Sequence, residues 1–120
     1  MDNHSFEFNL NGEGSKVSKQ SVEEVLKDDL NRSDEGYILG DYMSVSDGKI
    51  SFNGEDLSGQ YRYYYHEEVI SLLDKLQKEL EFHFTGSFTW YSQDVSVDYV
   101  HDYIFDGKGN YELKFSDSSE

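Results

Sequence analysis

The stretch YHEEVISLLDKLQKEL, residues 65–80, decides how the rest of the chain is organised. Glu67 and Glu68 fall near its start, where carboxylates suit the positive end of a helix dipole. Its apolar residues recur at helical spacing, so they lie along one side, and a helix with one apolar side must bury it against another element. We therefore predict a helix over residues 65–80 that packs on neighbouring strands. Its apolar side comprises Val69, Leu72, Leu73, Leu76 and Leu80.

The clearest predicted strand follows this helix directly. Residues 81–91, EFHFTGSFTWY, alternate between large rings and polar side chains, which is the period of a half-buried strand. Gly86 stands in the apolar row, and a glycine inside a strand often marks a bulge or a close packing neighbour. The rings expected on one face are Phe82, Phe84, Phe88 and Trp90.

Shorter alternating segments predict the remaining strands. Asp47 and Gly48 can adopt the positive φ angles of a tight hairpin turn. A second turn is expected at residues 106–110, and residues 116–120 are expected to fray. The predicted strands cover residues 6–10, 37–45, 49–53, 95–105 and 111–115.

A shorter helix is predicted near residues 19–30, with Ser21 and Glu24 spaced as a capping box. The element order is then β-α-β-β-α-β-β-β, and strands joined by short turns pair antiparallel. We predict a single α+β domain over residues 1–120, with one antiparallel sheet of about five to six strands and two helices on one face. The aromatic-rich segment 60–65 is interpreted as a lead-in to the second helix rather than a strand.

Composition indicates a folded, acidic protein. Hydrophobic residues make up only 36% of the chain, but aromatic residues make up 16%, and a disordered acidic chain would be poor in large rings. The net charge is -15, spread over both halves of the sequence. Such charge disfavours nucleic acid and anionic membranes as direct ligands and favours a basic partner, although solubility alone can also explain it. With no signal segment and no long apolar run, a cytoplasmic location is expected.

No motif in the sequence announces a reaction. The chain has no cysteine, no nucleophile elbow and no phosphate-binding glycine loop, so we expect no enzymatic activity and no cofactor. The acidic segment from Asp29 departs from a calcium loop, because its sixth position is Asp34 and its twelfth is Gly40. A small metal-binding enzyme domain using His83 and His101 is the alternative, although strand parity points the nearby Asp98 and Asp102 away from His101.

The residues predicted to bind a partner are acids on the two hairpins and part of a tyrosine cluster. Carboxylates on a rigid body can replace phosphates in contacts with lysine and arginine. Tyrosine is a favoured anchor at protein interfaces. Asp98 and Asp102 share one face of a strand, about 13 Å apart, within the range of phosphate spacings. The candidates are Asp41, Asp47, Glu55, Asp56, Tyr61, Tyr63, Asp94, Asp98, Asp102 and Asp106.

In size, charge and lack of active-site motifs the chain resembles small acidic counter-defence proteins of phages and mobile elements, such as anti-CRISPR proteins and DNA mimics. The resemblance is to the class and rests on no family motif. It implies a non-enzymatic inhibitor that blocks the nucleic-acid site of a CRISPR–Cas effector or another basic defence protein. An immunity protein that neutralises a nuclease toxin has the same features, and a structural component of a phage particle is neither supported nor contradicted.

Overall fold

The computed structural model describes residues 3–32, 41–56, 66–94 and 97–119. The order of helices and strands is the one predicted from the sequence. No described helix is both long and apolar enough to cross a membrane. The elements are β1 (Asn3–Glu13), α1 (Lys19–Arg32), β2 (Met43–Ser46), β3 (Lys49–Asp56), α3 (His66–Leu80), β4 (His83–Asp94), β5 (Val97–Asp106) and β6 (Tyr111–Ser119).

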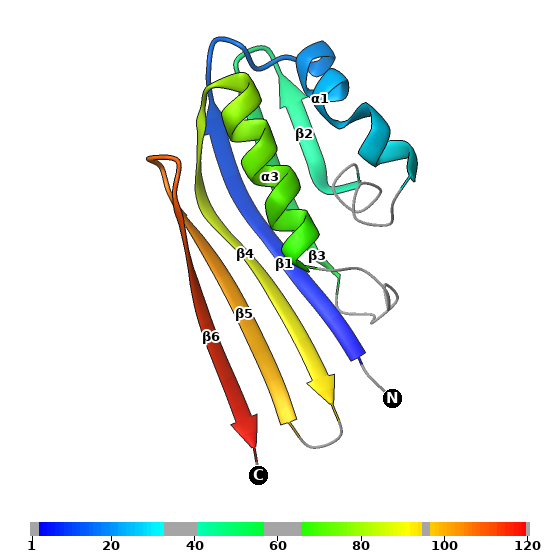
Figure 1. Ribbon diagram of the computed structural model, residues 1–120, viewed down its shortest axis with the longest axis vertical. Helices are drawn as coiled ribbons and strands as arrows, with labels where there is room; N and C mark the ends of the chain where they lie inside the picture. Colours follow the sequence, from blue (N-terminus) through cyan, green and yellow to red (C-terminus); the bar gives the residue numbers. More distant parts are fainter. Residues whose placement is uncertain (1–2, 33–40, 57–65, 95–96, 120) are drawn as a thin grey trace.

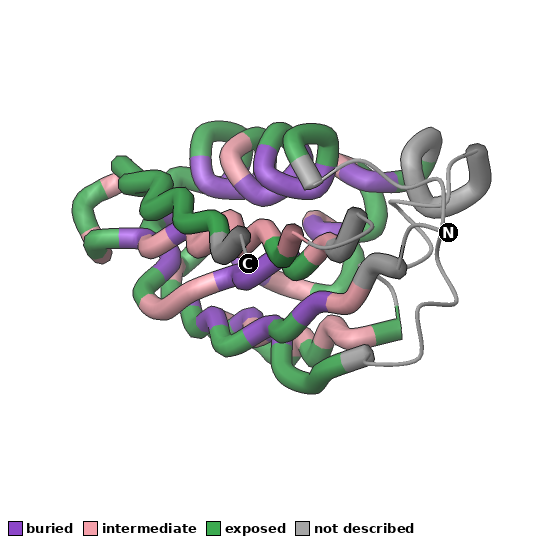
Figure 2. The backbone as a smooth tube through the Cα atoms, turned by 90° about the horizontal axis from the view of Figure 1, so that it is seen from below, coloured by how far each residue is buried: buried purple, intermediate pink, exposed green. Residues whose placement is uncertain are grey.

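The six strands form one antiparallel sheet in the order β2-β3-β1-β4-β5-β6. The first strand of the chain lies inside the sheet, paired with β3 on one side and β4 on the other. Both helices cover the same face of the sheet, and their buried residues face it (Figures 1 and 2). The predicted α+β architecture, with two helices on one face of an antiparallel sheet, is therefore confirmed.

The core lies between α3 and the central strands. Val69, Leu73 and Leu76 on α3 are fully buried, as the helical spacing of the apolar residues predicts. They meet a layer of rings from the sheet, in which Phe8 of β1 stacks on Phe88 of β4 with ring centroids 4.7 Å apart. The rings predicted to share a face after the helix are all buried in this cluster: Phe82, Phe84, Phe88 and Trp90.

Gly86 brings β1 and β4 into close contact. It pairs with Leu10 in the ladder and has a φ of 115°, a conformation that side chains with a Cβ rarely adopt. A Cβ at this position would stand 2.0 Å from the carbonyl oxygen of Asn9. The sequence expectation of a bulge or close neighbour at Gly86 is thus explained by the backbone of β1.

The structure confirms the predicted start of α1 but corrects its capping residue. The helix begins at Lys19, and Ser18 rather than Ser21 is its N-cap. The Ser18 hydroxyl accepts a hydrogen bond from the Ser21 backbone N–H at 3.1 Å, and the Ser21 hydroxyl accepts one from the Ser18 N–H at 2.9 Å. Serine at both positions forms the reciprocal cap, so Glu24 is not needed.

Two strand predictions also change. Asp41 and Tyr42 are helical, so the predicted strand over residues 37–45 is wrong at these two positions, whereas β2 confirms it from Met43 onward; residues 37–40 lie outside the described part. The tail predicted to fray instead continues β6 to Ser119, because it pairs with β5 up to Val97. The lead-in over residues 60–65 is also outside the described residues.

Candidate protein-binding face

The face of the sheet turned away from α1 and α3 carries polar side chains, and we call it the open face. Strand alternation produces it: on β1, the exposed Glu7 and Asn9 alternate with buried Phe6 and Phe8. The ladder places the equivalent positions of all the strands on the same side. Both helices cover the other face, so within the described part of the chain no helix covers the open face (Figure 2).

Acidic residues dominate the charge of the open face. They come from four strands, and the sheet brings the acids of β1 and β3 onto the same face as those of the β5–β6 hairpin. The lysines among its described side chains are Lys49 and Lys114. The acidic side chains are Glu7 and Glu13 on β1, Glu55 on β3, Asp98, Asp102 and Asp106 on β5, and Glu112 on β6.

Glu7 lies in a row of mostly charged residues that runs across the sheet from β3 to β6. Its ladder partners are Glu55 on β3 and Thr89 on β4. The row continues from Thr89 to Asp102 on β5 and ends at Lys114 on β6. Directly opposite residues on neighbouring strands have Cβ atoms about 5 Å apart, so Glu7 and Glu55 are an unfavourable like-charge pair.

The negative charge of this row affects the pKa of the nearby Tyr91. Tyr91 is 37% exposed on the open face. On β4 it is the next residue after Thr89 that points to this face. Burial raises the pKa of the Tyr91 hydroxyl, and the neighbouring carboxylates, led by Glu7, raise it further. Negative charge opposes ionisation to a phenolate. The same potential attracts a basic side chain.

Two of the predicted acids are held in place by hydrogen bonds. The Thr89 hydroxyl donates to Oδ1 of Asp102 at 3.0 Å, which orients this carboxylate across the β4–β5 ladder. Asp106 accepts hydrogen bonds from the backbone N–H groups of Lys108 at 2.7 Å and Asn110 at 3.1 Å. These bonds, the one from Lys108 first, lower the pKa of Asp106. Asp106 therefore organises the β5–β6 turn, whereas Asp102 is positioned on the face itself.

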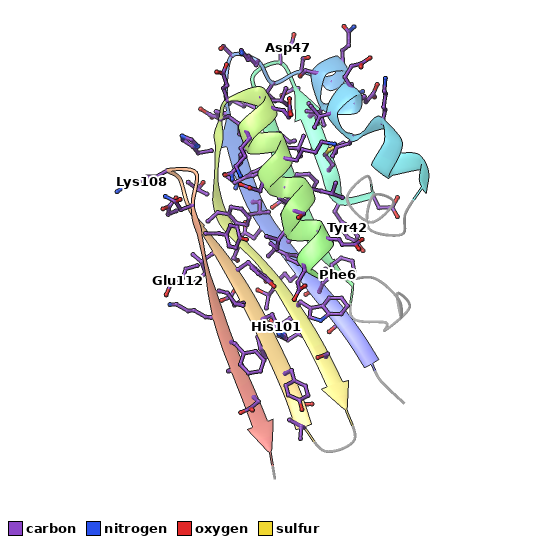
Figure 3. All side chains as sticks on the ribbon, in the orientation of Figure 1. Phe6, Tyr42, Asp47, His101, Lys108 and Glu112 are labelled. Atoms are coloured by element: carbon purple, nitrogen blue, oxygen red, sulfur yellow. The ribbon has the colours of Figure 1, made fainter. Side chains whose placement is uncertain are left out.

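The structure brings together only part of the predicted binding set. Four of its members lie on the open face: Glu55, Asp98, Asp102 and Asp106. Asp41 precedes β2, and Asp47 is exposed in the β2–β3 turn at one end of the sheet (Figure 3). Tyr61 and Tyr63, and the side chains of Asp56 and Asp94, lie outside the described part of the chain.

Three acids of the open face were missed in the sequence, namely Glu7, Glu13 and Glu112. For Glu7 the signal was present, because it alternates with Phe6 and Phe8 and so must lie opposite the core. What the sequence lacks is the strand order, which puts β1 between β3 and β4. The place of Glu7 in the charged row, between Glu55 and Thr89, follows from that order.

The structure separates the two histidines of the metal-binding alternative. His83 is exposed on β4 and alternates with buried Phe82 and Phe84, so it belongs to the open face. His101 pairs with Trp90 on the helix side, with its ring centroid 4.9 Å from that of Phe115 (Figure 3). Side chains on opposite faces of a sheet cannot share a metal ion, so this alternative is wrong in its geometry. Among the described residues no group of three or more potential ligands gathers.

The hollows on the open face are shallow. One of them, between β1 and β3, is lined by Glu7, Asn9, Gly54 and Glu55 and opens broadly to solvent. Small-molecule sites are concave and largely apolar, whereas protein interfaces are broad. The shape and charge of the open face therefore suit a protein surface. Comparison with protein-family models, curated proteins and solved structures gives no match for the chain.

Proposed function

We propose that the chain is a non-enzymatic inhibitor that acts in the cytoplasm of a host cell on a basic, nucleic-acid-binding protein. The open face occupies that protein's nucleic-acid site and keeps nucleic acid out. A CRISPR–Cas effector or another defence nuclease has the required basic channel. The observation that carries the proposal is the acidic open face, on which Glu7 and Glu55 lie directly opposite each other.

The spacing of the carboxylates supports replacement of phosphates. Neighbouring strands place Glu7 and Glu55 about 5 Å apart, while Asp98 and Asp102 are about 13 Å apart along β5. Lysine and arginine side chains that normally contact successive phosphates can pair with carboxylates at such intervals. Unlike a flexible acidic tail, the sheet holds these groups in fixed positions, which reduces the entropy lost on binding.

The like-charge pair provides a second argument. In the free protein, Glu7 and Glu55 repel each other across the ladder, and no ion pair within the described residues involves either of them. An arginine or lysine from a partner would neutralise the repulsion as it binds. Association driven in this way is fast and weakens as salt rises.

The test is capture of host proteins from a nuclease-treated lysate, with the chain immobilised. Proteins retained at low salt are identified and then challenged with single-stranded DNA. The proposal expects a basic nucleic-acid-binding protein that DNA displaces and that high salt releases. Its identity separates a CRISPR–Cas effector from a nuclease toxin, for which the chain would be the immunity protein.

Matched variants locate the interface. The open-face variant E7Q/E55Q/D98N and the control E23Q/E24Q/E79Q, on the helices, change the net charge equally. The open-face variant should lose the captured protein, and the control should retain it. Equal retention by both variants, or retention of no nucleic-acid-binding protein by the unmodified chain at either salt concentration, would overturn the proposal.

A further inference from the structure

The two edges of the sheet differ in how they are protected. β2, at one edge, is only four residues long, and α1 lies beside it (Figure 1). β6, at the other edge, is nine residues long, and among the described strands it pairs with β5 alone. The outer side of β6 therefore presents backbone N–H and C=O groups that can pair with another strand.

β6 also exposes large apolar side chains on the helix side of the sheet. Tyr111, Leu113 and Phe115 are 43%, 45% and 53% exposed. They are uncovered because α3 lies over the central strands, and β5 and β6 extend beyond it (Figure 1). The ring of Phe115 also packs against Tyr99, with centroids 6.2 Å apart, so the patch continues onto β5. An apolar patch beside an unpaired edge is typical of an interaction surface.

The sequence of β6 is complementary to itself when read antiparallel about Leu113. The segment is Tyr111-Glu112-Leu113-Lys114-Phe115. In that register Tyr111 of one copy lies opposite Phe115 of the other, and Glu112 lies opposite Lys114. The two Leu113 residues lie opposite each other at the centre. We propose that β6 pairs antiparallel with β6 of a second copy, on a two-fold axis through Leu113, so that two sheets join into one.

The geometry of this pairing is consistent on both faces. Residues that pair in this register have the same parity, so each face of one sheet continues into the same face of the other. On the open face, Glu112 lies opposite Lys114 of the second copy. On the helix side, Tyr111 lies opposite Phe115 of the second copy. An interface related by a two-fold axis uses the same patch on both subunits, as this one does.

The self-complementarity favours a second copy over a strand from an unrelated protein. A register centred on Phe115 instead would place Leu113 opposite Asp117 and Lys114 opposite Ser116, and would lose the charge pairs. Within the described residues neither Glu112 nor Lys114 takes part in an ion pair, although Lys114 lies opposite Asp102 in the ladder. The charges of Glu112 and Lys114 are therefore available to the second copy.

Net charge opposes the dimer and gives it a distinctive salt dependence. Each copy carries -15, so two copies repel each other at low ionic strength. Salt screens this repulsion and leaves the apolar contacts and backbone hydrogen bonds intact. Dimerisation should therefore strengthen as salt rises, whereas binding of a basic partner through the open face should weaken. The proposals can thus fail independently.

The test is sedimentation velocity of the full chain over a concentration series, at about 0.1 M and about 1 M salt, where the Debye lengths are about 10 Å and 3 Å. We expect a monomer–dimer equilibrium whose dissociation constant falls at the higher salt concentration. In L113K two like charges meet on the axis, and the dissociation constant should rise by about tenfold or more. The control E23K, on α1, makes a similar charge change away from the edge and should dimerise at least as well as the unmodified chain.

Charge variants test the register. E112K alone and K114E alone each place like charges opposite one another twice, so each should dimerise more weakly by a few-fold to about tenfold. Mixing E112K with K114E restores two opposite-charge pairs and should form a mixed dimer. Circular dichroism and thermal unfolding establish that each variant is folded. A chain that stays monomeric at both salt concentrations, a dimer unaffected by L113K, or a mixture no better than its components would overturn the proposal.

Discussion

Glu7 on β1 lies directly opposite Glu55 on β3, so two carboxylates face each other across one cross-strand position on the open face. Like charges in such positions destabilise a sheet. Both residues are exposed, and the neighbouring Tyr91 has its pKa raised in part by them. The like-charge pair therefore lowers the stability of the free protein, whereas it favours the proposed binding of a basic partner.

Replacing Glu55 with glutamine should stabilise the chain and weaken binding. At low salt, E55Q should raise the free energy of unfolding by about 0.2–1 kcal/mol, and the gain should shrink at high salt. Urea denaturation at two salt concentrations measures it. The control E23Q, on the exposed side of α1, should change stability by less than about 0.5 kcal/mol. A loss of stability in E55Q would mean that the Glu55 carboxylate has a favourable partner.

Gly86 should tolerate no side chain. G86A places a Cβ against the carbonyl oxygen of Asn9 and imposes a positive φ on alanine, so we expect a loss of about 3 kcal/mol in unfolding free energy. Thermal and chemical denaturation measure the loss. The neighbouring S87A, on the open face, is the control and should remain within about 0.5 kcal/mol of the unmodified chain. Equal stability of the two variants would show that β1 and β4 can separate locally.

Gln77 links α3 to the start of β4. Its side chain is 4% exposed, and its Oε1 accepts a hydrogen bond from the backbone N–H of Phe84 at 2.8 Å. Q77M preserves the approximate volume but leaves that donor buried without its acceptor, which should cost about 1–3 kcal/mol. Denaturation compares it with S71A on the exposed side of α3. Hydrogen exchange at Phe84 should accelerate in Q77M, and unchanged exchange would contradict the role given to this bond.

His101 should make the fold sensitive to mild acid. Burial lowers the pKa of His101 below its ordinary 6.5, and the negative charge of Glu67 offsets this in part. The unfolded chain therefore takes up the proton first as the pH falls. Stability should decrease as the pH drops below about 6.5 and continue to decrease until the folded-state pKa is passed.

The H101Q variant isolates this contribution. Between about pH 7.5 and about pH 5 it should lose less stability than the unmodified chain, because the carboxylates titrate in both proteins and only His101 differs. An NMR titration of the imidazole gives the pKa directly. A value at or above 6.5 in the folded protein would reverse the sign of the expected effect.

Much of the fold could be predicted from local patterns. Val69, Leu73 and Leu76 recur at helical spacing, and only a helix buries them on one side. The alternation through Phe84 and Phe88 is likewise buried only by a strand. The helix cap was misplaced because Ser18 and Ser21 are both suitable capping residues, and sequence alone does not choose between them. The tail was misjudged because strand pairing with β5, rather than hydrophobic pattern, extends β6 to Ser119.

The candidate site was predictable only in part. Asp98 and Asp102 were placed on one face correctly, since residues four apart on a strand share a side. Asp106 was given a binding role, whereas its hydrogen bonds to Lys108 and Asn110 are made within its own turn. The predicted binding residues also omit Glu7, whose place in the charged row depends on the pairing of β1 with β3 and β4.

The sequence by itself determined the elements, their order and the side of each strand that is buried, because these depend on periodicity within short segments. Only the tertiary structure decided which acids meet. Pairing of β1 with β3 sets Glu7 against Glu55, a contact between segments distant in the chain, and pairing of β1 with β4 joins this pair to Thr89 and Asp102 of the β4–β5 hairpin. Strand order also left β6 at an unprotected edge. Long-range pairing, rather than local preference, therefore formed both surfaces for which we propose partners.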